Sequence, residues 1–312
     1  GPKNIAQQGP ANLDGITYIV TPEDSVRIGA LLAGQAGFIR QVQAYDEKQA
    51  TDQGFKVYAA PTRGVNDSLS FRPDNPLVAD LRVRQALLHA TNAKQVVETL
   101  FSANYPQATS VLASSAAGYV NLSDKLTFDQ AKARQLLDEA GWKAGADGIR
   151  VKEGQRLELT LLVSKKVLND ALIPIAKENW RQIGVLLKPQ VVDFNALMAQ
   201  RKAGNYDLAS FSTSTLNDPH DGVWDFYSSE AKESGYHNAE VDKLINAGNA
   251  VLDIEQRKPI YHQLYKVLAD DPPVILLGYR NILSASSARV SGFKPDIYNG
   301  LTGSLPDVKI VK

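Results

Sequence analysis

The sequence predicts an α/β fold, and three observations lead to this prediction. Between residues 156 and 212, strand-like apolar runs alternate with amphipathic helical runs, a pattern typical of a layer with parallel strands. The composition, 44% hydrophobic and 22% charged, lies in the range of ordinary globular proteins. The chain has 312 residues, whereas a single domain usually has roughly 100–200, so we expect two lobes.

The first expected elements are short. Residues 13–20 are typical of a strand because β-branched and aromatic residues follow a turn-forming Asp-Gly pair. Residues 22–32 predict an amphipathic helix with acidic residues in its first turn, where the helix dipole favours them, and Gly34 ends it. Residues 55–58 and 67–71 predict further short strands.

A helix is expected after Asp80, which has the side chain of a good N-cap and follows a linker bracketed by Pro73 and Pro76. Apolar side chains three or four residues apart form its buried face, namely Val83, Leu87 and Ala90. Its other face carries the polar side chains Arg82, Arg84 and Gln85.

Caps and glycines delimit the next helices. Asn92 is expected to cap one helix, and residues 127–130 have the spacing of a capping box that starts another. Gly141 is a good C-terminal stop for this second helix, directly before Trp142.

The alternating pattern fills the middle of the chain. Residues 149–163 predict a hairpin whose second strand is largely buried. A helix, a strand, a helix and a strand follow, at residues 169–183, 185–192, 194–202 and 206–212. Two long helices and a buried strand come last, at residues 238–252, 254–269 and 274–278. Candidate boundaries near residues 73–80 and 278–292 indicate that the middle forms one lobe and that the two ends belong together.

The composition also excludes several classes of protein. Lys+Arg and Asp+Glu are both 34, and this balance argues against a nucleic-acid groove or a polybasic membrane patch. The chain has no cysteine, which excludes disulfides, thiolate nucleophiles and iron–sulfur centres. No apolar run approaches the roughly 20 residues that span a bilayer. The opening Gly1-Pro2-Lys3 lacks an initiator Met and is typical of a protease-cleavage remnant.

No catalytic or metal-binding motif is present in the sequence. The four histidines lack the i, i+4 pairing of a metalloprotease helix, and there is neither a Gly-x-Ser-x-Gly elbow nor a Gly-rich phosphate loop. We therefore expect no catalytic residue, no metal and no cofactor. His89 and His262 fall on predicted helices, where a structural imidazole is expected, and His220 falls in a predicted loop.

One segment has the pattern of a ligand contact. The buried strand 206–212 leads into the small hydroxyl residues 212–215, and ligands of open α/β sheets bind outside the carboxyl ends of strands. The alternative is a Ser/Thr-rich connection without a function. Residues 217–222 are typical of a turn, although Asp218 and Asp221 would also suit an acid–base pair. Trp224 and Tyr227 either stack on a ligand or belong to the core.

Several stretches, taken in this order, resemble the extracytoplasmic solute-binding proteins of ABC importers, family 5, the peptide/nickel/oligopeptide-binding class. They are Ala30-Leu-Leu-Ala-Gly34, Asp80-Leu-Arg-Val-Arg-Gln-Ala86, Gln135-Leu-Leu-Asp-Glu-Ala-Gly-Trp142, Tyr206-Asp207, Asp218-Pro219, Tyr236-His-Asn238 and Pro272-Pro-Val-Ile275. The resemblance covers most of the chain and implies its C-terminal portion only, as a fragment without the family's large N-terminal part.

The resemblance implies a periplasmic-binding-protein-like fold of type II, with a mixed sheet flanked by helices. Residues 80–277 would form lobe II, residues 1–79 a hinge-proximal remnant of lobe I, and residues 278–312 the return segment to lobe I. It further implies a periplasmic or extracytoplasmic monomer that captures a peptide-like or other small polar solute and delivers it to ABC permease subunits. No nucleic acid is expected, and the membrane is reached only through the permease or through a lipid anchor outside this chain.

The resemblance also suggests the ligand contacts. We expect hydrogen bonds from the hydroxyls, amides and charges of Ser212, Thr213, Thr215, Asn217 and Asp218, with Trp224 and Arg280 as further contacts. In the peptide-binding branch an Asp four residues before the Asp-Pro proline commonly binds the amino terminus of the peptide. Thr215 occupies this position and cannot form that ion pair, so a broader solute class stays open.

Two other functions remain open on the same fold. One is a ligand-sensing or interaction module that contacts another protein instead of a permease. The other is a serine-type hydrolase that uses Ser214 with Asp218 or His220.

Overall fold

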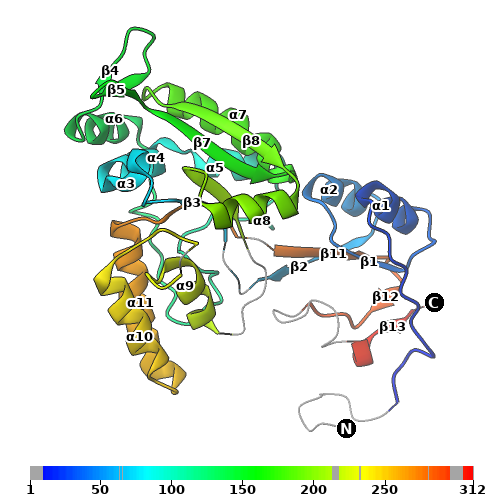
Figure 1. The fold of residues 1–312 in the computed structure, drawn as a ribbon. Coiled ribbons are helices and arrows are strands. Elements are labelled where there is room, and N and C mark those ends of the chain that lie inside the picture. The colour runs from blue at the N-terminus through cyan, green and yellow to red at the C-terminus, as the bar shows by residue number, and fades with distance from the viewer. Residues whose placement is uncertain are drawn as a thin grey trace. The chain divides into compact units, whose positions relative to one another are not determined.

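The computed structural model describes residues 10–62, 64, 66–212, 218–231, 233–279, 281–295 and 305–311 (Figure 1). Its contacts divide the chain into two compact units. The larger unit holds residues 63–100 and 106–279, and the smaller one holds residues 1–62, 101–105 and 280–312. The chain therefore passes into the larger unit after residue 62 and leaves it after residue 279, and the short segment 101–105 between these points belongs to the smaller unit. The lobe boundaries expected at 79/80 and 277/278 stay a prediction.

The smaller unit is built on a three-stranded antiparallel sheet of order β1-β11-β2. Its strands are β1 (Phe38–Arg40), β2 (Lys56–Pro61) and β11 (Asn281–Ser286), and its helices are α1 (Asp24–Leu32) and α2 (Ala44–Asp52). A shared core of Ile28, Leu31, Ile39, Ala50, Leu283 and Ala285 joins the two ends of the chain. A short pair of strands, β12 (Val290–Ser291) with β13 (Lys309–Ile310), and the 3₁₀ turn η1 (Leu305–Asp307) complete its regular elements among the described residues.

The expected strand at residues 13–20 is wrong. This segment has no regular structure, and its apolar side chains face solvent, with Tyr18 66%, Ile19 76% and Val20 90% exposed. A strand requires a neighbour for its N–H and C=O groups, and β-propensity alone does not provide one. The helix expected at residues 22–32 is confirmed as α1, and Gly34 follows it with φ +74°.

A five-stranded mixed sheet of order β10-β3-β9-β7-β8 is the centre of the larger unit. Its members are β3 (Asp67–Phe71), β7 (Glu158–Ser164), β8 (Leu186–Val192), β9 (Leu208–Phe211) and β10 (Val274–Gly278). Strand β7 pairs in parallel with β8 and β9, as the alternating pattern predicts. Strand β3 runs antiparallel to both β9 and β10, so the sheet is mixed.

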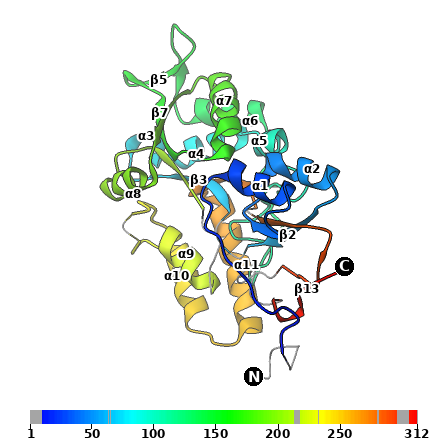
Figure 2. The same cartoon turned by 90° about the vertical axis from the view of Figure 1, so that its right-hand side faces the viewer.

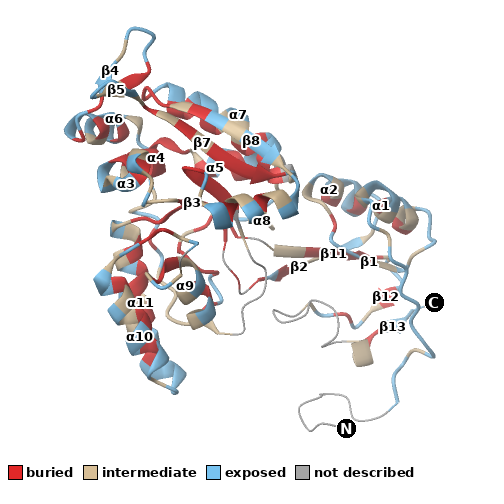
Figure 3. Ribbon diagram, in the orientation of Figure 1, coloured by how far each residue is buried: buried red, intermediate tan, exposed pale blue. Residues whose placement is uncertain are grey.

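Helices pack against this sheet and against one another. Helix α5 packs on α7 and on β10, α7 packs on β8, and α8 packs on β7. The bounds of the helices in this part are α3 (Pro76–Ala79), α4 (Leu81–Ala90), α5 (Ala93–Leu100), α6 (Gln130–Glu139), α7 (Val167–Arg181) and α8 (Phe194–Ala203). Figure 3 shows the strands of the sheet as mostly buried and the outer helix faces as exposed.

A second core lies beside the sheet, around the helices α9 (Pro219–Tyr227), α10 (Ala239–Asn249) and α11 (Ile254–Asp270). Helices α10 and α11 lie side by side, which Figures 1 and 2 both show. Three buried tyrosines on these elements, Tyr227, Tyr261 and Tyr265, pack in this core together with Tyr236. The expected structural role of His89 fits its burial and the 2.8 Å contact of its Nδ1 with the carbonyl of Thr127.

Most expected helix ends are confirmed, with one exception. The carboxylate of Asp80 accepts the N–H of Arg82 at 2.9 Å, and Asn92 accepts the N–H of Gln95 at 3.0 Å. The capping box at residues 127–130 is not formed, because Asp129 is the N-cap of α6 and accepts the N–H of Lys132. An Asp directly before a helix is at least as good an N-cap as a Thr, so Asp129 caps this helix in place of Thr127, which lies two residues earlier.

The expected hairpin at residues 149–163 is divided between two sheets. Strands β4 (Lys143–Ala144), β5 (Arg150–Lys152) and β6 (Gln155–Arg156) form a small antiparallel sheet, and β7 belongs to the five-stranded one. Residues 76–79 also differ from the expected linker, since Pro76 opens the short helix α3 behind its N-cap Asn75.

Arg84 does not lie on an exposed helix face, as its sequence pattern suggests, but is buried at 5% exposure. Its guanidinium donates to the carbonyls of Val78, Ala79 and Pro272 and pairs with the carboxylate of Asp271. The guanidinium thus ties the first helices of the larger unit to the turn before β10. An arginine can be buried where every donor finds an acceptor.

We expect Arg84→Ala to lower the free energy of unfolding by about 3–5 kcal/mol, because it removes the guanidinium that donates to the Oδ1 atom of Asp271 and to three carbonyls. Urea denaturation followed by circular dichroism measures this loss. Arg82→Ala, an exposed neighbour on the same helix, is the control and should cost only a small fraction as much. Equal losses for the two variants would contradict the structural role of Arg84.

Candidate functional site

Polar side chains gather where the strands of the five-stranded sheet end. The parallel strands β7, β8 and β9 all finish at one edge, and the antiparallel β3 begins there with Asp67. Strand β10 also reaches this edge, because Gly278 pairs with Asp67. Ligands of α/β sheets bind outside the carboxyl ends of the strands, and the topology brings Ser212, directly after β9, to this edge.

Two neighbouring connections meet at this edge. Ser212 directly follows β9, and Lys166 follows β7 as the N-cap residue of α7. The Nζ atom of Lys166 donates to the Oγ atom of Ser212 at 3.2 Å and lies 3.9 Å from the Oδ1 atom of Asp67. The Lys166 side chain is 35% exposed, whereas that of Asp67 is 8% exposed. A cation, a hydroxyl and a buried carboxylate are therefore in contact at the end of the sheet.

Ser212 is the expected residue in this group, and Lys166 and Asp67 were not predicted. A signal for both was present in the sequence. Lys166 follows the predicted strand that became β7, and Ser212 follows the one that became β9. Parallel strands of one layer end at the same edge of the sheet, so both residues could have been expected there. Asp67 could not be placed because its strand is antiparallel, and single-strand patterns do not reveal direction. Four expected contacts, Thr213, Thr215, Asn217 and Arg280, lie outside the described residues, as does Ser214.

Asp218 is held by contacts within the chain. It is the N-cap of α9 and accepts the N–H of His220 at 2.8 Å. Both of its oxygens also accept hydrogen bonds from the guanidinium of Arg257 on α11, at 2.6 and 2.7 Å. The hydrogen bonds from Arg257 hold the pKa of Asp218 below its usual range, although partial burial opposes them. Asp218 thus ends the segment that begins at Ser212 and ties it to α11.

The arginine partner is fixed in turn. Arg257 is 8% exposed, its guanidinium donates to the hydroxyl of Tyr261, and it lies over the ring of Tyr261 with 5.1 Å to the centroid. The Asp218 hydrogen bonds raise the pKa of Arg257, so the pair stays ionised. Arginine suits this position because its planar fork matches both carboxylate oxygens.

The turn expected at residues 217–222 is corrected by the structure, since helix α9 begins at Pro219. His220 therefore lies in the first helical turn and not in a loop. Asp and Pro favour both turns and the first positions of helices, so the sequence alone did not distinguish a turn from a helix start here. The acid–base use of Asp218 is disfavoured here, because an ion-paired carboxylate with a lowered pKa is a weak general base.

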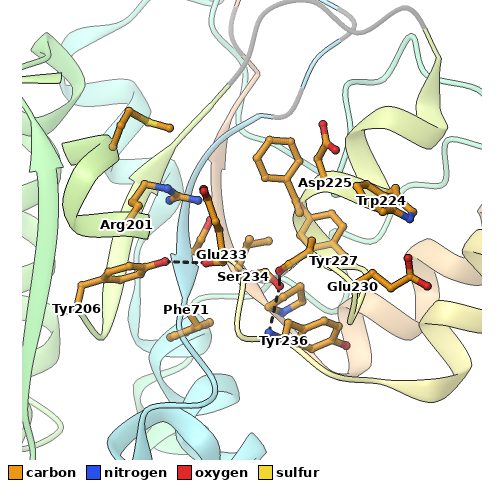
Figure 4. A pocket seen from close by; sticks show the side chains of 16 residues that line it. Phe71, Arg201, Tyr206, Trp224, Asp225, Tyr227, Glu230, Glu233, Ser234 and Tyr236 are labelled. Carbon is orange, nitrogen blue, oxygen red and sulfur yellow. Dashed lines mark hydrogen bonds between the residues drawn. The ribbon is translucent and has the colours of Figure 1, made fainter. Parts of the chain in front are cut away.

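Trp224 lies elsewhere, in a cavity of about 420 Å³ beside α8 and α9. Neither Ser212 nor Lys166 is among the described residues that line this cavity (Figure 4). The structure thus brings Ser212 and Lys166 together, ties Asp218 to α11, and gives Trp224 a separate environment.

The described residues contain no group of three or more His, Cys, Asp or Glu side chains that could hold a metal ion. In the same part of the chain, no helix is both long and apolar enough to cross a membrane.

The sequence of the chain matches a known protein family. The family model described as "Bacterial extracellular solute-binding proteins, family 5 Middle" matches residues 4–234. The oligopeptide-binding protein AppA of Bacillus subtilis is 30% identical over 321 residues, covering 94% of this chain and 56% of that protein. The dipeptide-binding protein of Escherichia coli is 22% identical over 298 residues, with 91% and 53% covered. The chain spans about half the length of the curated relatives it matches.

Solved structures show the same fold. Bacillus subtilis AppA in complex with a nonapeptide has a TM-score of 0.78 at 25% identity, covering 94% of this chain and 60% of that one. HbpA2 from Haemophilus parasuis has a TM-score of 0.81 at 20% identity, with 96% and 59% covered. These likenesses confirm the expected type II periplasmic-binding-protein-like fold with a mixed sheet.

We expect Asp218→Asn to lower the free energy of unfolding by about 1 kcal/mol at pH 7, a modest value because Asp218 is 41% exposed. Asparagine is as good an N-cap as aspartate, so the variant removes the charge and keeps the cap. Because the folded-state pKa of Asp218 is lowered, the difference from wild type is full above about pH 4 and is lost as the pH falls below that value.

Urea denaturation of both proteins between pH 7 and pH 3 measures this difference. Asp225→Asn, an exposed position on the same helix, serves as the control. A difference between wild type and Asp218→Asn that is independent of pH would show that the Arg257 pair does not stabilise the fold.

Proposed function

The chain belongs to family 5 of the bacterial extracellular solute-binding proteins, and we propose that the whole protein is the solute-binding subunit of an ABC importer. In this role it captures a peptide-like or other small polar solute and delivers it to a membrane permease. The observation that carries the proposal is the family membership together with polar groups at the sheet edge where the fold places ligands. The family is extracellular, in agreement with the expected periplasmic or extracytoplasmic location.

The contact between Lys166 and Ser212 is the proposed centre of the solute site in the larger unit. An ammonium group that is 35% exposed and next to a hydroxyl can donate to a carboxylate or carbonyl of a solute. The carboxylate of Asp67 lies 3.9 Å from the ammonium group and helps to orient it. We propose that Thr213, Thr215 and Asn217 add neutral donors and acceptors from the segment between Ser212 and Asp218.

The two ends of that segment are anchored differently, and both anchors matter for binding. Ser212 continues from β9, while Asp218 is fixed by α9 and by Arg257. We infer that Asp218 positions the segment and does not itself contact the solute. Both of its oxygens already accept hydrogen bonds from Arg257, and one of them also accepts the N–H of His220. A segment fixed at both ends loses less conformational entropy when it binds a solute.

The charges of the site favour one solute class. Lys166 is cationic and Thr215 is neutral, so we propose a solute that presents a carboxylate or another acceptor to this edge. The relatives differ in what their names record, from oligopeptides and dipeptides to heme and glutathione, so the family alone leaves the solute open. These relatives are named as binding proteins, and we propose that this chain likewise binds without catalysing a reaction.

We expect Lys166→Ala to weaken solute binding by the full-length protein roughly 10- to 100-fold, the usual effect of losing a hydrogen bond to a charged group. Ser212→Ala should weaken binding less, since it removes a neutral hydroxyl. Native mass spectrometry of the protein purified from its host identifies the solute, and calorimetry then gives the dissociation constants.

Lys243→Ala removes an exposed lysine of α10 and is the matched control, which should leave the affinity unchanged. Wild-type affinity in Lys166→Ala would contradict the proposed site. Turnover of the bound solute would contradict the proposed absence of a reaction.

A further inference from the structure

The larger unit contains a cavity that the proposed solute site does not use. Its floor is formed by Ser70 and Phe71 of β3 and by Pro273 and Val274 at the start of β10. Residues of α8 form one wall, and α9 forms the other together with Glu230, Ala231, Glu233, Ser234 and Tyr236 (Figure 4). A volume of about 420 Å³ lies in the range of small-molecule sites, roughly 300–1,000 Å³.

The lining of this cavity is rich in aromatic side chains. Six aromatic side chains contribute to it, namely Phe71, Tyr206, Trp224, Phe226, Tyr227 and Tyr236. Aromatic faces bind apolar groups and also attract cations through their quadrupoles, most strongly in tryptophan. Trp224 is partly buried, so its ring is accessible to a ligand in the cavity.

The charged groups around the cavity are mostly acidic. Asp225, Glu230 and Glu233 are exposed, and none of the three forms an ion pair with another described residue. Arg201 is the one cation among the described lining residues, and it is 5% exposed. Among the described lining residues, the three carboxylates and the guanidinium together carry a net charge of about −2.

The charges are also separated in space. Figure 4 shows Arg201 and Tyr206 on one side of the cavity, with Trp224, Asp225 and Glu230 on the other. Burial lowers the pKa of Arg201, whereas electrostatic interactions with Tyr206 and Glu233 oppose this effect. Glu233 is therefore the lining carboxylate that interacts with Arg201. Asp225 and Glu230 therefore provide negative charge beside the aromatic wall that Arg201 does not offset.

A buried hydroxyl provides a further polar group in the lining. Tyr227 is 1% exposed, and its OH group has no hydrogen-bond partner among the described residues. Desolvation raises the pKa of Tyr227, so the hydroxyl stays neutral and can accept a hydrogen bond from a cationic donor.

We propose that this cavity binds an apolar or aromatic group that carries an ammonium cation. The aromatic lining takes the apolar body, and Asp225 and Glu230 take the charge. The proposal does not rest on the proposed function, because neither Lys166 nor Ser212 is among the described residues that line the cavity.

The test measures binding of 2-phenylethylamine to the full-length protein by calorimetry, with 2-phenylethanol and phenylacetate as neutral and anionic probes of similar shape. We expect the amine to bind at least 10-fold more tightly than either of the other probes, and added salt to weaken its binding. Equal affinity for all three probes, or a preference for phenylacetate, would overturn the proposal, as would no binding of the amine at millimolar concentration.

The decisive variant is Asp225→Asn combined with Glu230→Gln, which should weaken amine binding at least 10-fold. Both positions are exposed, so the fold is retained, and circular dichroism verifies this. Asp124→Asn combined with Glu98→Gln makes the same change of charge at exposed positions that do not line the cavity, and should leave amine binding unchanged.

Equal weakening in the two double variants would show a general charge effect and would contradict the proposal. Lys166→Ala separates the two sites, since it should preserve amine binding even where solute binding is lost.

Discussion

The pairing of β3 between β10 and β9 is the constraint on which the larger unit depends. Leu69, at the centre of β3, is fully buried and lies opposite Ile275 on one side and Ser210 on the other. Three segments far apart in the sequence thereby become neighbouring strands, and β3 is paired on both of its sides. Because β3 runs against its neighbours β9 and β10, and β7 is parallel to both β8 and β9, the sheet has one edge where the other strands end and β3 begins.

That edge determines what the site can contain. The connections after β7 and β9 bring Lys166 to Ser212, and the start of β3 adds Asp67. The pair of Asp218 and Arg257 then holds the far end of the segment against α11 and its tyrosine core. The acidic, aromatic cavity beside α8 and α9 has a different lining, and the proposed solute site and the proposed amine pocket differ in charge as well as in place.

Local patterns in the sequence predicted the elements that are stabilised locally. Asp80 and Asn92 could be predicted as caps because each lies directly before its helix. The parallel strands around α7 could be predicted from the alternation of strand and helix patterns along that part of the chain. Features that depend on distant partners were not predictable in this way. The sequence pattern around Arg84 did not reveal that this residue is buried, because its burial depends on the distant Asp271. The pairing of Asp218 with Arg257 was not predicted, because the two residues lie 39 positions apart in the sequence. The β-propensity of residues 13–20 did not produce a strand. Ser212 was placed correctly at a strand end, but its contact with Lys166 requires the parallel register of β7 and β9.

The central claim is that solute contacts from this chain come from the sheet edge after β7 and β9. Amide hydrogen exchange of the full-length protein, with and without the solute that co-purifies with it, tests this claim most directly. We predict that the solute slows exchange at residues 164–169 and 211–218 and leaves the solvent-facing turns of α10 and α11 unchanged. Slowed exchange elsewhere in the larger unit, with neither of those two segments affected, would contradict the account.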